Sequence, residues 1–308
     1  MRTAFSLPLV LFLIAASLAQ ADSFGTGANL FNIEFVTIGD PGNVADTTGV
    51  PNPAGSVPHI YRIGKFEISE QMIDKANAAG GLDITKFTRS PNKPASDITW
   101  YEAAKFVNWL NTSTGNSPAY KFDGGGNFQL WTPSDAGYNA SNLYRNSLAR
   151  YFLPSADEWY KAAYFDASAG GYHGYPTGSS SVPDGIDSPG DIFFDAVFLD
   201  VVAKAQPNDI TDVGVLSPYG TAGQGGNIWE WEETDLDLVN DSVSSPRGLR
   251  GGSWVTTSNF MSSSSRSSPP HADASIGFRV ASVVPEPSSL LLGLIAFVSF
   301  ATARRKSS

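Results

Sequence analysis

The residues with the most particular pattern lie in one stretch, Gly248–Ser268, which reads GLRGGSWVTTSNFMSSSSRSS. A Gly-Gly-Ser-Trp turn leads into small hydroxyl side chains, and GFRVAS follows from Gly277. A serine or threonine hydroxyl acts as a nucleophile when a neighbouring base activates it, and this stretch contains no histidine. We therefore interpret Ser262–Ser265 as loop surface. The stretch has the form of a site whose reactive groups are missing.

The rest of the chain offers few other groups for catalysis. It has no cysteine in 308 residues, which excludes thiol mechanisms and cysteine metal sites. Its three imidazoles are His59, His173 and His271, and they show no H-E-x-x-H or other metal-ligand spacing. A Ser-His-Asp triad has members that are distant in sequence, but no G-x-S-x-G motif supports one here.

Composition indicates a globular protein with many turns. Hydrophobic residues make up 42% of the chain, which also has 30 Gly and 20 Pro. The formal net charge is −10. No basic stripe is present to neutralise phosphates, so we expect no nucleic-acid partner.

Both ends are predicted to be sorting signals. Residues 1–21 combine Arg2, an apolar run and an A-x-A cleavage pattern, as in a signal peptide. Residues 284–308 contain Val-Pro-Glu-Pro, the apolar run Leu290–Ala301 and a basic end. This order resembles the PEP-CTERM signal, which implies export, transient membrane anchoring and cleavage by an exosortase after signal peptidase has acted. The alternative is an ordinary tail anchor, although the run is shorter than a full span.

Between these ends the pattern predicts one α+β domain with much loop. Alternation of apolar residues predicts strands at Phe31–Ile38 and Tyr61–Ile68. Three helices are expected after the capping residues Ser69, Thr99 and Ser155, the last two in capping boxes. Residues 170–189 are predicted to be an irregular loop, and no long helix is expected after Asp191.

Five motifs in order resemble the formylglycine-generating enzyme family, also called sulfatase-modifying factors. The resemblance covers Asn32–Val283 and implies a single domain with the irregular C-type-lectin-like fold. The motifs are Ile98-Thr99-Trp100-Tyr101-Glu102-Ala103-Ala104, Leu153-Pro154-Ser155-Ala156-Asp157-Glu158-Trp159, Gly226-Asn227-Ile228-Trp229-Glu230-Trp231, Arg250-Gly251-Gly252-Ser253-Trp254 and Gly277-Phe278-Arg279.

The resemblance also implies a chemistry from which this chain departs. The family's oxidases use two cysteines with copper, shortly after the Gly-Gly-Ser turn, because a soft thiolate holds Cu(I). Those positions fall on Thr256 and Met261, so we expect no copper and no catalytic residue there. A second branch of the superfamily uses three-histidine iron sites in a separate helical domain. This chain has neither that domain nor enough histidines, and no iron is expected.

The resemblance implies a structural calcium site at the G-N-x-W-E-W turn. Its ligands would be the carbonyls of Gly226 and Ile228 and the carboxylate of Glu230, while Gly223 lacks the side-chain ligand of the family. Alternatively, Glu230 pairs with Arg250 or Arg279 and the turn is held without metal. An extended segment places Trp229 and Trp231 on one face and Glu230 on the other.

Three functions of different classes remain open. The first is a non-catalytic, exported binding or matrix module of the cell envelope or extracellular polymer, with an extracellular polysaccharide or envelope protein as partner. Its predicted binding cleft contains Trp229, Ser253, Trp254 and Arg266. The second is an enzyme of formylglycine-generating or other chemistry in the same cleft, using Ser253, Arg266 and His271. The third is a purely structural envelope protein.

Overall fold

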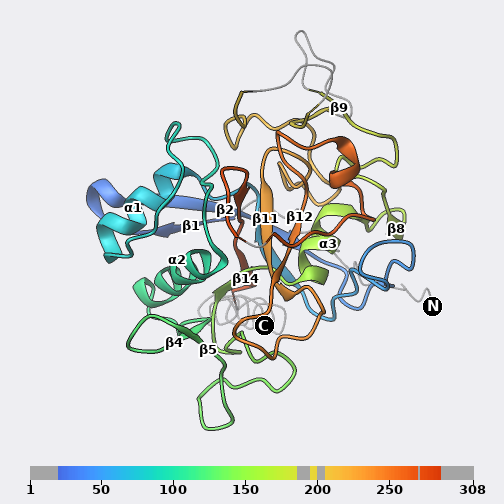
Figure 1. Ribbon diagram of the computed structural model, residues 1–308. Helices are drawn as coiled ribbons and strands as arrows, with labels where there is room; N and C mark the ends of the chain where they lie inside the picture. Colours follow the sequence, from blue (N-terminus) through green and yellow to red (C-terminus); the bar gives the residue numbers. More distant parts are fainter. Residues whose placement is uncertain (1–19, 186–194, 200–204, 270, 286–308) are drawn as a thin grey trace, which may run out of the picture.

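The computed structural model describes residues 20–185, 195–199, 205–269 and 271–285, which form the expected mixed α+β fold with few helices (Figure 1). The apolar part of the predicted signal peptide and the tail beyond residue 285 lie outside the described residues, so their processing stays a prediction. Within the described residues, no helix has the length and apolar character needed to cross a bilayer.

The three predicted helices are confirmed, with the predicted caps. Ser69 accepts a hydrogen bond from the Met72 amide, and Gly81, at φ +62°, ends the first helix. Thr99 and Ser155 each form the reciprocal capping box with the glutamate three residues later. The helices are α1 (Glu70–Gly80), α2 (Trp100–Ser113) and α3 (Ala156–Tyr164).

The largest sheet is antiparallel throughout, in the order β1-β2-β3-β14-β6. The strand predicted at Phe31–Ile38 is confirmed, whereas the one predicted at Tyr61–Ile68 ends at Gly64. Beyond Gly64 the backbone pairs with other segments, since the Ile68 amide donates to the Phe278 carbonyl. The strands are β1 (Gln20–Phe24), β2 (Phe31–Ile38), β3 (Tyr61–Gly64), β6 (Tyr151–Phe152) and β14 (Ala281–Val283).

A smaller sheet carries the W-E-W motif on its central strand. β11 pairs antiparallel with β12 and parallel with β13. Its bounds are β11 (Trp229–Asp235), β12 (Arg247–Arg250) and β13 (Ile276–Gly277). The remaining elements are η1 (Gly27–Asn29), β4 (Lys121–Phe122), β5 (Phe128–Gln129), β7 (Phe165–Asp166), β8 (Gly171–Tyr172), β9 (Asp184–Gly185), β10 (Asp195–Ala196) and η2 (Ser258–Met261).

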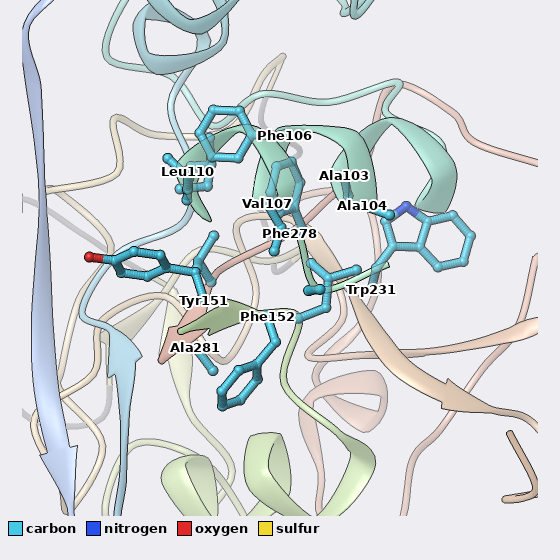
Figure 2. Packing of buried hydrophobic residues seen from close by; sticks show 14 of the residues in the cluster. Ala103, Ala104, Phe106, Val107, Leu110, Tyr151, Phe152, Trp231, Phe278 and Ala281 are labelled. Carbon is cyan, nitrogen blue, oxygen red and sulfur yellow. The ribbon is translucent and has the colours of Figure 1, made fainter. Parts of the chain in front are cut away.

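Helix α2 packs on the core through one apolar face. Figure 2 shows Phe106, Val107 and Leu110 of α2 on the side that faces Phe278, and all four are buried. Their spacing of three and four residues is the helical repeat that predicted this face. The predicted loop at 170–189 is described up to residue 185, and the strands in this part are the two-residue β8 and β9. Residues 186–189 of the prediction lie outside the described residues.

Candidate functional site

The Gly-Gly-Ser-Trp turn brings together Thr256 and Met261, the two positions that the family resemblance aligns with cysteines. Gly251 and Gly252 have φ of +92° and +70°, a conformation that favours glycine. A Cβ built on Gly252 would lie 3.0 Å from Thr256 Oγ1 and 3.3 Å from Met261 Cγ. Thr256 and Met261 therefore lie over the same glycine.

The hydroxyl of Thr256 is used within its own turn. Thr256 Oγ1 accepts a hydrogen bond from the Ser253 amide at 2.7 Å and donates to the Ser253 carbonyl at 3.1 Å. The Thr256 carbonyl accepts from the Leu199 amide at 2.9 Å. These bonds close the turn, and no imidazole takes part in them.

Met261 is part of an apolar core. Its side chain is 0% exposed and packs with Tyr175, Ala196 and Phe198. Its carbonyl accepts a hydrogen bond from the Tyr164 hydroxyl at 2.9 Å. The thioether thus fills space as a hydrophobic side chain.

The predicted cleft residues near this turn have different environments. Trp229 is buried, and its ring meets Phe260 edge to face at 5.6 Å. Phe260 and the neighbouring Val255 are each 43% exposed. Trp254 is partly exposed, but its indole Nε1 is buried with no hydrogen-bond partner among the described residues. The exposed apolar surface at this turn therefore belongs to Val255 and Phe260, which sequence reasoning did not select.

The other three predicted site residues are Ser253, Arg266 and His271, and each has a different environment. Ser253 is fully buried. The guanidinium of Arg266 donates to Glu232 at 2.8 Å and to the carbonyls of residues 234, 235 and 236. His271 lines a cavity beside Trp100 and Trp231, and no hydrogen bond joins it to Ser253 or Arg266 in the described part of the chain. The structure thus does not assemble these three into one site.

Strand β11 is the centre of a buried ion-pair network. Its side chains alternate between two faces, and each of its four carboxylates meets a guanidinium. The network holds five carboxylates and five arginines and is neutral as a whole. Its pairs are Arg279–Glu230, Arg250–Glu232, Arg266–Glu232, Arg145–Glu233, Arg145–Glu158 and Arg247–Asp235.

The predicted calcium turn is held by an arginine. Arg279 donates to both carboxylate oxygens of Glu230, at 2.5 and 2.6 Å. The Trp159 indole donates to the same carboxylate at 2.7 Å. The Gly226 carbonyl accepts from the Ile228 amide at 2.7 Å. A Ca²⁺ ion needs six to eight oxygens, and at Glu230 it would have to displace a guanidinium. As arranged, these residues fit calcium poorly and match the alternative pairing with Arg279.

One buried acid next to this turn was missed by the sequence analysis. Glu67 is buried, and its Oε1 accepts from the Asn227 amide group at 2.9 Å, while Oε2 has no partner among the described residues. Burial raises its pKa to about 8, against the opposing effect of Arg279, which Glu230 already neutralises. The available signal was that Glu67 is the single acid in the otherwise apolar and basic run YRIGKFEI.

The sequence matches a known protein family. Residues 36–284 match the family model described as "Sulfatase-modifying factor enzyme 1-like domain". No curated protein matches the chain.

Solved structures share the fold at low sequence identity. Treponema denticola variable protein 1 has a TM-score of 0.59 at 19% identity, with 86% of this chain and 99% of that chain covered. CarF has a TM-score of 0.59 at 18% identity, with 82% and 99% covered. PvdO from Pseudomonas aeruginosa has a TM-score of 0.53 at 14% identity, with 85% and 98% covered.

Proposed function

The chain belongs to the sulfatase-modifying factor enzyme 1-like domain family, and we propose that it is a non-catalytic member that acts as an exported binding module. The observation that carries this proposal is the state of the two cysteine positions. Thr256 is hydrogen-bonded within its turn, and Met261 is buried in an apolar cluster. Neither residue can hold Cu(I) as a thiolate does, while the scaffold around them is complete.

The ligand we propose is an extracellular polysaccharide, with an envelope protein as the second kind of partner. Val255 and Phe260 form an exposed apolar surface beside the partly exposed Trp254. Aromatic side chains on a rigid turn supply contact area at low entropic cost. The predicted signal peptide and sorting tail would deliver this surface to the envelope, where signal peptidase and an exosortase would process the chain.

The test is saturable binding of the purified protein to a panel of extracellular polysaccharides. We expect at least one polymer to bind, and Phe260→Ala to weaken that binding about tenfold, since it removes a large contact ring. Leu148→Ala is the matched control, because Leu148 is 59% exposed outside this turn. Equal losses in both variants, or no saturable binding by the wild type, would contradict the proposal and favour a purely structural protein.

A further inference from the structure

Four exposed aliphatic side chains gather at the end of the large sheet where β14 ends. Val283 and Val284 are 43% and 38% exposed, Ile60 is 48% exposed and Leu148 is 59% exposed. Exposed apolar residues are common when they are scattered over a surface, but these four come from three segments that are neighbours in the sheet. We call this set of four residues the β14 collar.

Strand pairing brings the collar residues together. Val283 lies opposite Tyr61 in the antiparallel pair of β14 and β3. Ile60 and Val284 therefore occupy the next positions of the same pair. On the other side of β14, the Val283 amide donates to the Arg150 carbonyl at 2.9 Å. The collar thus surrounds the point at which the chain leaves the sheet.

The charges beside the collar favour an anionic surface, although the whole chain is acidic. Leu148 is two residues before Arg150, whose side chain is partly exposed. Arg150 and the buried Arg62 both pair with Asp22, so this group of three carries one net positive charge. The three segments of the collar contain no Asp or Glu, and they are residues 58–62, 147–151 and 281–285. Anionic headgroups would therefore attract this end of the sheet.

The predicted membrane segment follows the collar closely in the sequence. Pro285 is the last described residue, and residues 286–289 separate it from the apolar run Leu290–Ala301. The five steps from residue 285 to residue 290 span at most about 18 Å when extended. A short tether of this kind gives effective concentrations on the order of millimolar, so even a weak contact between the collar and the lipid surface is populated.

We infer that the β14 collar rests on the lipid surface while the tail anchors the chain, an inference that depends on the export and anchoring in the proposed function. The four aliphatic side chains enter the interfacial region, where apolar side chains reach about 5–10 Å below the headgroups. The Arg150 guanidinium stays at the level of the anionic headgroups. Because the predicted sorting motif starts at Val284, the collar holds this motif at the membrane surface.

The test uses single fluorescent dyes, which the absence of cysteine from the chain allows. Full-length Ile60→Cys, Leu148→Cys and Leu30→Cys are labelled and reconstituted into vesicles of phosphatidylethanolamine and phosphatidylglycerol that contain a nitroxide lipid. Leu30 is the matched control, because it is 48% exposed, as Ile60 is, and precedes β2 at the opposite end of the same sheet. We expect nitroxide quenching at positions 60 and 148 to exceed that at position 30 at least about twofold, since position 30 lies roughly 25 Å along the strand from the collar.

A charge in the collar should weaken the contact. Leu148→Asp, added to the chain labelled at position 60, should lower the quenching at position 60, because a carboxylate resists transfer into an apolar environment. Leu148 is exposed, so this substitution leaves the core packing unchanged. Quenching at position 60 that is the same with and without Leu148→Asp would count against the collar as the contact.

A dye at Ser299, inside the apolar run, reports separately whether the tail is inserted. Strong quenching at position 299, with equally weak quenching at positions 60, 148 and 30, would overturn the inference and leave the anchoring intact. A shielded dye at position 60 that the nitroxide lipid does not quench would mean that a second protein molecule covers the collar, and would also overturn it. A lack of quenching at position 299 would contradict the predicted anchoring, and the inference would fall with it.

Discussion

At positions 256 and 261, which the family resemblance aligns with two cysteines, the chain carries a hydroxyl and a thioether. Each has a complete local role, because Thr256 bonds to Ser253 and Met261 fills an apolar cluster. The family resemblance predicts that these positions are neighbours. It could not predict that Met261 is fully buried, because the residues that cover it, such as Tyr175 and Phe198, come from distant segments.

At the same scale, the burial of Glu67 predicts that the stability of the folded protein depends on pH. Its pKa is about 8 in the folded protein and has its ordinary value of 4.5 when exposed. The folded state therefore binds a proton that the unfolded state releases, and Glu67 makes stability fall as pH rises from about 4.5 to 8. Glu67→Gln should remove this loss and stabilise the protein on the order of 3 kcal/mol at pH 7.

Urea unfolding of the wild type and of Glu67→Gln across this pH range measures the difference. Glu34→Gln is the control, because Glu34 is exposed and lines the same hollow as Glu67. This substitution should leave the pH profile of stability unchanged. A constant difference between wild type and Glu67→Gln at every pH would show that Glu67 is ionised when buried.

Glu230 gives the second prediction for a single residue. Because Arg279 already neutralises this carboxylate, we expect the same melting temperature in millimolar calcium and in EGTA. Glu230→Gln leaves the buried Arg279 charge unpaired and should destabilise the protein by about 3–5 kcal/mol in both conditions. A calcium-dependent rise in melting temperature that Glu230→Gln abolishes would establish the metal site implied by the family resemblance.

At the scale of elements, the sequence predicts the helix caps but not the contacts between distant segments. Ser69, Thr99 and Ser155 cap the three helices as predicted, since a cap needs residues at most three positions apart. The ion pairs of β11 join residues far apart in sequence, such as Glu230 and Arg279. No periodicity specifies such pairs, and for that reason the sequence predicts a cleft position for Arg266, whose guanidinium instead pairs with Glu232 in this network.

The two capping boxes provide a matched pair of glutamates. Glu102 and Glu158 occupy the same position in their boxes, but Glu158 also pairs with Arg145. Burial tends to raise the pKa of Glu158, but Arg145, the His59 imidazole and the Ser155 amide together outweigh burial and hold this pKa well below its ordinary value. Its contribution to stability is therefore present above about pH 4.5 and is lost as pH falls.

Substitution by glutamine should separate the cap from the ion pair. Glutamine still serves in a capping box, so Glu102→Gln should cost less than about 1 kcal/mol. Glu158→Gln should cost about 3–5 kcal/mol at pH 7, because it leaves the charge of Arg145 only partly compensated. Denaturant unfolding of both variants checks this, and equal small losses would mean that the Arg145 pair contributes little.

At the scale of the whole molecule, the buried β11 network is neutral, whereas the chain as a whole is acidic. The β11 network balances five acids with five arginines, whereas the full sequence has a formal net charge of −10. The excess negative charge therefore lies outside the network, where it favours solubility. With no cysteine available for disulfides, core packing and these buried pairs hold the loop-rich domain together.

Processing of the two ends is a prediction for the whole chain. We expect the mature protein to begin near Asp22 and to lack Arg304–Ser308. A start at Asp22 is compatible with the fold, because the Asp22 carboxylate accepts from Arg62 at 2.6 Å and from the Tyr151 hydroxyl at 2.8 Å. Intact-mass analysis of the native protein checks both ends, and retention of Arg304–Ser308 would contradict the predicted cleavage.

The central claim is that this chain keeps the family scaffold without the family oxidation. The most direct measurement is incubation of the copper-treated protein with a sulfatase-type cysteine peptide, followed by mass analysis of the peptide for an aldehyde. A family enzyme with both cysteines is the positive control. With Thr256 and Met261 at the cysteine positions, we predict no aldehyde above that formed by peptide and copper alone. Aldehyde formation that rises with the amount of this protein would contradict the account.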